Sequence, residues 1–585
     1  MDFKLGHYLI FAITPMESYF CRTAISDVPQ TKELKHTHPW GGRGVGLTVP
    51  TRSAHAQPIR LFHPQLLFFL LLPLLLSAPL AAQPASATAS TIPALFLSDV
   101  HLDPYHDPAK VTKLNAAPAA DWPTILAQPD APAQSADFAA LQAACPVRGV
   151  DTPNALWLSS LHAIHTNAAH ARFVTLSGDL LAHQFDCKYR ALLPAATHAD
   201  YLAFAEKTIQ YVVTSLRESL PGVPIYVAMG NNDSGCTDYA LDPAHDEFLA
   251  LTAKAVAEAL PGDLSQADRD AALRDFATGG NYNVPLAAVP HARLIVLDDV
   301  FLSVRYTTCS GKPDPAPAAA QLAWLQAQIN YARQHGERVW VMGHIPPGVD
   351  LYSTARRVPN LCTGGKPQMF LGSEGLAEVL AANADIVRLA LFGHTHSDEM
   401  RLLTPSSTEA GAPHLGVPGE LARGGERLDS EMLAKDVPVK VVASITPVNG
   451  NRPTFTLASI DPATATLVDY TVIMASNSIG LAATWSSEYT YSAAYHQPAF
   501  DAPALASLIT GFQADPAAKS PASQAYLRDY FPGDLSSLLQ LAWPQYACSM
   551  DHDSGQSFTA CACAARSSLH AATPAPSATS PSQSK

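Results

Sequence analysis

The sequence predicts an α/β fold whose largely covered sheet carries polar residues at its strand ends. Short apolar runs, rich in β-branched and aromatic residues, alternate with amphipathic stretches of helical length. Each run is followed closely by Asp, Gly-Asp, Gly-Asn or Gly-His. Nearly half of the 585 residues are apolar, so there is enough material for a sizeable buried core.

The expected strands and helices follow one another in a regular order. The strands are Ala94–Leu97, Phe173–Leu176, Ile225–Met229, Leu294–Leu297, Val339–Met342 and Leu389–Phe392. The helices between them include Leu156–His170, Tyr201–Leu220, Ala318–Gln334 and Gly375–Asn383. This alternation is typical of α/β domains.

The pattern changes in the C-terminal part of the chain. Three successive strands without intervening helices, a meander, are expected at Val439–Ser444, Thr454–Ile460 and Thr466–Ala475. The helical pieces Pro503–Phe512, Ser523–Asp529 and Asp534–Ala542 then indicate a small helical subdomain. The polar, Gly- and Pro-rich segment Thr404–Pro438 predicts a loop inserted in a sheet.

An apolar stretch near the N-terminus has the layout of a secretory signal peptide. Leu61–Leu80 follows a basic residue, and small residues come after it, which favours cleavage near Ala82. A membrane anchor is the alternative, but the apolar core Leu66–Leu76 is short for a spanning helix and contains Pro73. Since 60 residues precede this stretch, we hypothesise that translation begins shortly before Leu61.

Cysteine usage agrees with export. Eight cysteines follow the leader: Cys145, Cys187, Cys236, Cys309, Cys362, Cys548, Cys561 and Cys563. An even number in an exported protein favours disulfides. The last three alternatively suggest a metal knot, but they lack the paired C-x-x-C spacing of zinc modules.

The net charge of −14 argues against nucleic acid as a partner, because phosphate backbones recruit basic surfaces.

Five short motifs, each just past an expected strand, carry the candidate chemistry. They are Asp99-Val100-His101 with Asp103, Gly178-Asp179 with His183, Gly230-Asn231-Asn232-Asp233, Gly343-His344, and Gly393-His394-Thr395-His396. Side chains at the carboxyl ends of neighbouring strands converge in one crevice. Carboxylate, imidazole and amide oxygen suit zinc, iron or manganese.

The spacing within the motifs fits shared metal ions. If the backbone is extended, Asp99 and His101 point the same way, and so do His394 and His396. Asp179 has two carboxylate oxygens and can bridge two ions about 3.5–4 Å apart. Each motif alone is weak, since an isolated D-x-H or G-D is more often a cap or a turn. All five in one order are difficult to explain as coincidence.

The order D-x-H, G-D, G-N-x-D/E, G-H, G-H-x-H resembles the calcineurin-like metallophosphoesterase superfamily, from about Pro93 to Asp461. The resemblance implies a four-layer α/β/β/α sandwich and a centre of two divalent metal ions, zinc before iron or manganese. It implies that Asp99, His101 and His396 hold the first ion, that Asn231, His344 and His394 hold the second, and that Asp179 bridges them.

Finer marks resemble the acid sphingomyelinase group. They are the run from Asp99 to Tyr105, His183 four residues after the bridging aspartate, and Ser444-Ile445-Thr446-Pro447 followed by Asn451-Arg452-Pro453. This resemblance also implies a disulfide between Cys309 and Cys362.

One residue departs from the family pattern. Most relatives have a histidine, resembling the general acid, where this chain has Asn232. Asparagine cannot supply a proton, so either His183 takes that role or the leaving groups are already good. Asp103 is the candidate partner that orients His101. The pair Asn231-Asn232 also resembles the corresponding motif of endopolyphosphatases. A cysteine-rich saposin-like domain, which sphingomyelinases of this group use to reach lipid, is not found ahead of Pro93.

The expected function is a secreted or periplasmic phosphodiesterase that cleaves phosphodiester or pyrophosphate bonds with a metal-bound hydroxide. Its expected substrate is a phosphodiester-containing small molecule or a lipid head group, selected by the insertion Asp107–Asp151 and the loop Thr404–Pro438. Endopolyphosphatase-like cleavage is an alternative, against which the acidic charge stands. A secreted metal-binding protein without turnover is another.

The expected domain organisation follows from these assignments. It is a leader (1–60), a signal peptide (61–82), a spacer (83–92), the catalytic domain (93–475), a helical cysteine-containing subdomain (476–570) and a disordered tail (571–585).

Overall fold

The computed structural model describes residues 90–405, 435–533 and 542–572. The chain divides into two units, 1–83 and 84–585, and the first lies wholly outside the described residues. The expected leader and signal peptide therefore lie outside them, as do nearly all of the helix expected at Asp534–Ala542 and the end of the tail. Among the described helices, none combines the length and apolar character needed to cross a bilayer.

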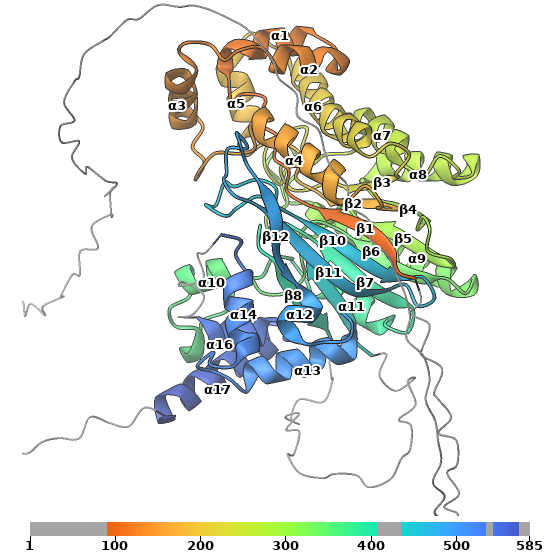
Figure 1. The fold of residues 1–585 in the computed structure, drawn as a ribbon, viewed down its shortest axis with the longest axis vertical. Helices are drawn as coiled ribbons and strands as arrows, with labels where there is room; N and C mark the ends of the chain where they lie inside the picture. The colour runs from red at the N-terminus through yellow and green to blue at the C-terminus, as the bar shows by residue number, and fades with distance from the viewer. Residues whose placement is uncertain (1–89, 406–434, 534–541, 573–585) are drawn as a thin grey trace, which may run out of the picture. The chain divides into compact units, whose positions relative to one another are not determined.

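Two six-stranded sheets form the centre of the second unit (Figure 1). In order across the first sheet, the strands are β12 (Trp485–Thr490), β11 (Thr466–Ala475), β10 (Thr454–Asp461), β1 (Ile92–Leu97), β2 (Val174–Ser177) and β3 (Ile225–Ala228). Across the second they are β4 (Tyr282–Pro285), β5 (Ala292–Val296), β6 (Arg338–Met342), β7 (Val387–Phe392), β9 (Val437–Val441) and β8 (Glu399–Leu403).

Parallel strands lie in the middle of both sheets. β1, β2 and β3 pair in parallel, as do β5, β6, β7 and β9. The sheets pack through aromatic side chains, since the Trp340 ring of the second sheet meets Phe96 and Phe173 at centroid distances of 6.0 and 5.9 Å. All six predicted central strands are present, because runs buried on both faces are apolar throughout.

Helices cover the outer faces of the sheets. Up to the end of β7 they are α1 (Val111–Ala116), α2 (Trp122–Leu126), α3 (Gln134–Ala144), α4 (Asn154–Asn167), α5 (Phe185–Leu192), α6 (His198–Ser219), α7 (Phe248–Ala259), α8 (Gln266–Gly279), α9 (Ala316–Gln334), α10 (Leu351–Arg357) and α11 (Gly375–Ala382). α7 contacts β3, and α9 contacts β5 and β6. The sandwich of helices and two sheets confirms the predicted fold class.

The predicted three-strand meander is wrong in its first member. β9 lies in the second sheet, parallel to β7 and antiparallel to β8, whereas β10, β11 and β12 form the meander in the first sheet. All five residues of β9 are buried, which fits an inner strand rather than a sheet edge. The predicted loop joins two neighbouring strands, since Leu403 pairs with Val437, and most of the loop lies outside the described residues.

A group of C-terminal helices packs beside β8 and β9. Its members are α12 (Tyr491–Tyr495), α13 (Ala502–Gln513), α14 (Pro521–Asp529), α16 (Trp543–Ser549) and α17 (Gly555–Ala572). α13 contacts both strands. Phe512, Tyr526 and Trp543 pack together and belong to the same hydrophobic core as the sheets. We call this group the C-terminal helical region.

Disulfides join the eight cysteines in pairs. The pairs are Cys145–Cys187, Cys236–Cys309, Cys362–Cys563 and Cys548–Cys561. The preference for disulfides over a metal knot is confirmed, but the expected Cys309–Cys362 pair is wrong. Cys362 lies in the short turn Leu361–Thr363 that follows α10. Its partner Cys563 belongs to α17 and packs against a small apolar cluster that contains Leu361 and Phe558.

Candidate metal centre

The five polar motifs meet where the parallel strands end. Asp99 follows β1, Asp179 follows β2, and Asn231 follows β3 at the edge of the first sheet. His344 follows β6 and His394 follows β7 in the second sheet. Two sheets thus contribute to one cluster, as expected for residues at the carboxyl ends of parallel strands.

The backbone at these residues is left-handed rather than extended. The φ angles are 49° at Asp99, 43° at His101, 56° at Asp179, 72° at His394 and 61° at His396. Their convergence therefore comes from tight turns and not from the strand-like alternation that the sequence suggested. Such conformations are uncommon outside glycine and collect at functional sites, where the surroundings hold them in place.

Two glycines leave room for the ligand side chains. A Cβ atom at Gly230 would lie 2.2 Å from Asp179 Oδ1, and one at Gly393 would lie 2.0 Å from Ser98 Oγ. Only glycine permits such a close approach. The glycine in each of these motifs is thus part of the site's geometry.

The first group contains Asp99, His101 and His396. Asp99 Oδ1 lies 3.2 Å from His396 Nε2 and 3.8 Å from His101 Nε2. His101 Nδ1 donates to the Leu181 carbonyl oxygen at 2.8 Å, which turns Nε2 toward the carboxylates. This buried Nε2 has no hydrogen-bond partner in the described structure, and an imidazole nitrogen so placed fits a metal ion.

The second group contains Asn231, His344 and His394. His344 Nε2 lies 3.2 Å from Asn231 Oδ1, and His344 Nδ1 donates to the Ser177 carbonyl oxygen at 2.7 Å. His394 Nε2 contacts the Tyr239 hydroxyl at 3.2 Å. One ligand atom each from Asp179, His344 and His394 lie within 4.8 Å of one another.

Asp179 lies between the two groups. Its Oδ2 atom is 3.3 Å from His101 Nε2 and 3.1 Å from His344 Nε2. Asn232 donates to the same carboxylate through its backbone N–H at 2.8 Å and its side-chain amide at 2.9 Å. Asn232 therefore holds this carboxylate in place.

The electrostatics of the cluster favour a cation. Burial lowers the pKa of His101 and His344, but the nearby carboxylates, Asp179 foremost, outweigh it and raise the values to about 9 and about 10. Burial and the charge of His344 lower the pKa of His394 to about 3, so that imidazole is neutral. The raised values mean that the carboxylates favour positive charge at His101 and His344, and a divalent metal bound to the neutral imidazoles would supply that charge in place of the protons.

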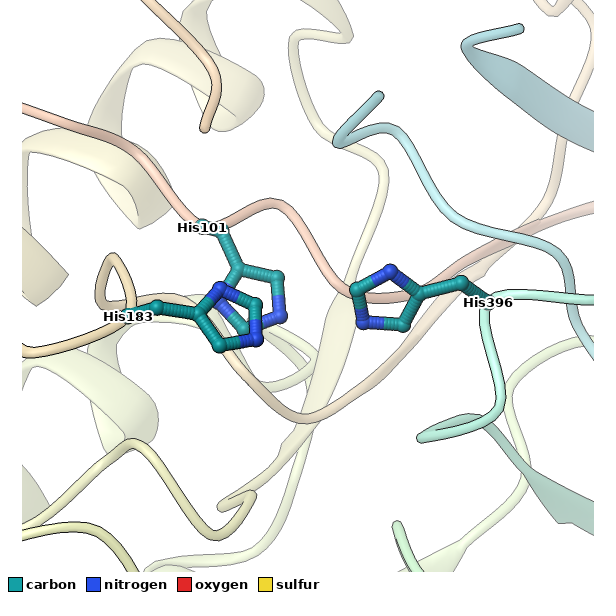
Figure 2. A group of neighbouring side chains, drawn as sticks. All are labelled: His101, His183 and His396. Atoms are coloured by element: carbon teal, nitrogen blue, oxygen red, sulfur yellow. The ribbon is translucent and has the colours of Figure 1, made fainter. Parts of the chain in front are cut away.

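His183 lies at the edge of the first group. Its ring stacks on that of His101 at a centroid distance of 4.1 Å, and the ring of His396 lies beside this pair, 5.8 Å from His183 (Figure 2). His183 Nδ1 contacts Asp151 Oδ1 at 2.8 Å, and the His183 backbone N–H donates to Asp151 Oδ2 at 2.9 Å. The side chain of His183 is 31% exposed, in contrast to the buried His101 and His344.

The predicted role of Asp103 is wrong. Asp103 Oδ2 pairs with Lys188 Nζ at 2.8 Å and does not orient His101, whose Nδ1 is taken by a backbone carbonyl. Lys188 also lies 3.5 Å from Asp151 Oδ2. Sequence reasoning missed Lys188 and the function of Asp151. Asp151 is 32 residues from His183 in the chain, and no local signal connects the two.

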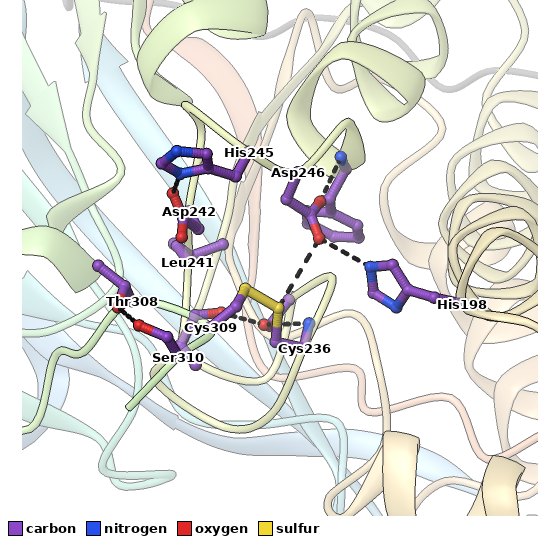
Figure 3. The surroundings of a disulfide bond; sticks show 12 residues. His198, Cys236, Leu241, Asp242, His245, Asp246, Thr308, Cys309 and Ser310 are labelled. Atoms are coloured by element: carbon purple, nitrogen blue, oxygen red, sulfur yellow. Dashed lines mark hydrogen bonds and ion pairs between the residues drawn. A yellow bond between two sulfur atoms is a disulfide. The ribbon is translucent and has the colours of Figure 1, made fainter. Parts of the chain in front are cut away.

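A disulfide between Cys236 and Cys309, shown in Figure 3, lies close in the chain to Asn231. Cys236 joins Cys309, and Asn231 Nδ2 donates to Asp238 Oδ1 at 2.6 Å. Arg305 in turn pairs with Asp238 at 3.3 Å. Asp246 lies beside this disulfide, but both sulfurs are bonded to each other and are not thiolate ligands.

The calcineurin-like phosphoesterase family matches residues 92–398, more than half of the chain. The chain belongs to this family and is a hydrolase that acts on phosphoric esters. It is 23% identical over 356 residues to the cyclic GMP-AMP phosphodiesterase SMPDL3A of Rattus norvegicus, covering 59% of this chain and 67% of that protein.

Two further similarities are more limited. The sphingomyelin phosphodiesterase of Homo sapiens is 28% identical over 209 residues, which are 34% of this chain and 28% of that protein. The crystal structure of a dimetal phosphatase from Danio rerio matches 68% of this chain and 99% of its own, with a TM-score of 0.35 and 11% identity.

Proposed function

We propose that the protein hydrolyses phosphodiester or pyrophosphate bonds at a centre of two divalent cations. The observation that carries this proposal is the place of Asp179. One of its oxygens lies within 3.3 Å of the Nε2 atoms of both His101 and His344, which belong to different ligand groups. A carboxylate so placed suits two cations held side by side.

Each ligand group would hold one cation. The first cation would be held by Asp99, His101 and His396, and the second by Asn231, His344 and His394. Asp179 would bind both. Zinc is the expected metal, with iron or manganese as alternatives. Such cations, when bound, neutralise phosphoryl oxygens and make water a better nucleophile.

His183 is the proposed proton donor to the leaving oxygen. Asp151 occupies its Nδ1, so Nε2 is the nitrogen left to face a substrate. Burial alone would raise the pKa of Asp151, but His183 and then Lys188 hold it well below its usual range, so this residue stays a carboxylate. The two hydrogen bonds to Asp151 hold the His183 ring in one orientation.

Two observations support the cellular setting and the substrate class. Four disulfides support secretion or a periplasmic location after removal of a signal peptide at 61–82. The relatives named as phosphodiesterases support a diester of a small molecule or lipid head group. We retain 93–475 as the catalytic domain and 476–570 as its helical partner.

The test compares bis-p-nitrophenyl phosphate with p-nitrophenyl phosphate, before and after chelation and with zinc, manganese or iron added back. We expect chelation to abolish turnover, one metal to restore it, and the diester to be the better substrate. Bound metal is measured in parallel.

The outcomes separate the alternatives. Metal-dependent turnover that favours the monoester would contradict a phosphodiesterase. Hydrolysis of polyphosphate but of neither ester would favour the endopolyphosphatase-like activity. Two equivalents of bound metal without any hydrolysis would favour the non-catalytic binding protein.

A further inference from the structure

Two arginines at the protein surface share one tyrosine. Arg148 Nη2 donates to the Tyr352 hydroxyl at 2.5 Å, and Arg356 Nη1 donates to the same oxygen at 2.6 Å. The two guanidinium carbons lie 4.7 and 5.2 Å from the centre of the tyrosine ring. All three residues are exposed, so this Arg148–Tyr352–Arg356 cluster faces solvent.

The cluster carries uncompensated positive charge. Among the described residues, no carboxylate lies within ion-pair distance of Arg148 or Arg356, and their recorded partner is a neutral phenol. Arg305, by contrast, pairs with Asp238 at 3.3 Å. In a chain of net charge −14, two neighbouring guanidiniums without a carboxylate are suited to an anion from outside.

Arg148 lies on the His183 side of the centre. It is three residues before Asp151, the partner of His183, and three residues of chain span at most about 10 Å. The intervening Gly149 packs against the Val448 carbonyl, because a Cβ there would lie 2.3 Å from that oxygen. The next residue, Asn449, contacts His396 Nδ1 at 3.2 Å.

Tyr352 reaches the cluster from the His394 side. The segment before it is bonded to the chain around Phe370, through Phe370 N to the Gly348 carbonyl at 3.1 Å and Asp350 N to the Gln368 carbonyl at 2.9 Å. The ring of Phe370 lies 5.6 Å from that of His394. The Arg148–Tyr352 contact therefore connects the two sides of the centre.

We propose that the Arg148–Tyr352–Arg356 cluster is a subsite for a second anionic group of the substrate. This inference rests on the proposed function and narrows its substrate class. Guanidinium groups bind phosphate through paired N–H donors and repel cations. The preferred substrates are then phosphate anhydrides or linked nucleotides with a second phosphate, rather than choline esters, whose second group is positively charged.

The test measures selectivity between two substrates. We compare kcat/KM for ADP with kcat/KM for p-nitrophenyl phosphorylcholine in the wild type, Arg148→Gln, Arg356→Gln and the control Arg357→Gln. Loss of a charged hydrogen bond should lower the ADP to phosphorylcholine ratio about tenfold in the first two variants. Arg357→Gln, on the same helix, should keep the ratio. A ratio unchanged in all variants would overturn the subsite.

A binding measurement separates failure of the subsite from failure of the proposed function. If the wild type hydrolyses neither these two compounds nor bis-p-nitrophenyl phosphate, the proposed function is wrong. Calorimetry with inorganic pyrophosphate and the metal-loaded protein still tests the cluster. Binding about tenfold weaker in Arg148→Gln and Arg356→Gln, but not in Arg357→Gln, supports the subsite. Equal affinity in all four proteins refutes it.

Discussion

The metal centre and the C-terminal helical region both bury charged groups, but they treat them differently. In the metal centre, several ligand atoms converge, and the buried His101 Nε2 has no hydrogen-bond partner among the described residues. Beside the C-terminal helices, the buried Glu399 accepts from Arg401 at 2.7 Å and from Tyr530 at 3.0 Å. An unpartnered imidazole nitrogen among carboxylates fits a metal ion, whereas a paired carboxylate such as Glu399 stabilises the fold.

This difference between the two regions predicts which substitutions lower activity and which lower stability. Changes in the metal centre should reduce metal binding and turnover while the fold persists. Changes around the C-terminal helices should reduce the free energy of unfolding and leave the chemistry intact.

The largest effect is expected for Asp179→Asn. The substitution keeps the size of the side chain but removes the charge shared by both ligand groups, so both metals should be lost. We expect kcat/KM for bis-p-nitrophenyl phosphate to fall at least about 1,000-fold, with bound metal measured by elemental analysis. Full metal content with a wild-type rate would contradict the bridging role.

Removal of the Cys362–Cys563 disulfide should lower the free energy of unfolding and leave metal binding and turnover unchanged. This bond closes a loop of 201 residues, and its loss in the Cys362→Ser/Cys563→Ser protein should cost about 2–5 kcal/mol of unfolding free energy. Denaturant unfolding measures this cost. The matched control, Cys236→Ser/Cys309→Ser, loosens the Asn231 loop and should lower activity as well. Equal activity losses in the two proteins would erase the distinction between the regions.

Asp151→Asn should have an intermediate effect on catalysis. Asparagine offers one acceptor oxygen in place of two, so it no longer holds His183 at both the backbone N–H and Nδ1, and kcat should fall about 10- to 100-fold while metal content is unchanged. Steady-state kinetics with bis-p-nitrophenyl phosphate and elemental analysis measure these two quantities. A change in KM alone, or a loss of bound metal, would indicate a structural role instead.

The smallest effect is expected for Glu488→Gln, in β12 beside the C-terminal helices. Burial, with Asp398 and Asp529 nearby, raises the pKa of Glu488 to about 8, from 4.5 for an exposed glutamate. The folded state therefore takes up a proton, and stability is lost as pH rises from about 4.5 to 8.

Glutamine cannot lose a proton, so the gain in Tm over the wild type should grow between pH 5 and pH 9. A constant difference in Tm across that range would count against this explanation. Activity at each pH is the control, and it should match the wild type.

The parts of the site that lie directly after strands were predictable from sequence. Asp99, Asn231 and His344 each follow an apolar run that forms a strand for local reasons, so their convergence follows from the fold class. The turn geometry was not predictable. The left-handed conformation of Asp99 depends on hydrogen bonds to the distant Gly178 and Thr446 backbones.

Contacts between segments that are far apart in the chain were beyond sequence reasoning. Asp151 reaches His183, and Cys362 reaches Cys563, only because the whole core brings their segments together. The Cys309–Cys362 disulfide, which was expected from the resemblance to the acid sphingomyelinase group, was wrong for the same reason. The placement of β9 in the second sheet likewise depends on its packing between β7 and β8.

The long Cys362–Cys563 connection also bears on how the chain matures. Cys362 is synthesised 201 residues before its partner, and four cysteines precede it in the described chain. During synthesis the Cys362 thiol therefore meets the earlier cysteines before Cys563 arrives. Any wrong pair formed in that interval must be opened by thiol–disulfide exchange before the native bond can close, so maturation of the chain depends on the redox conditions around it.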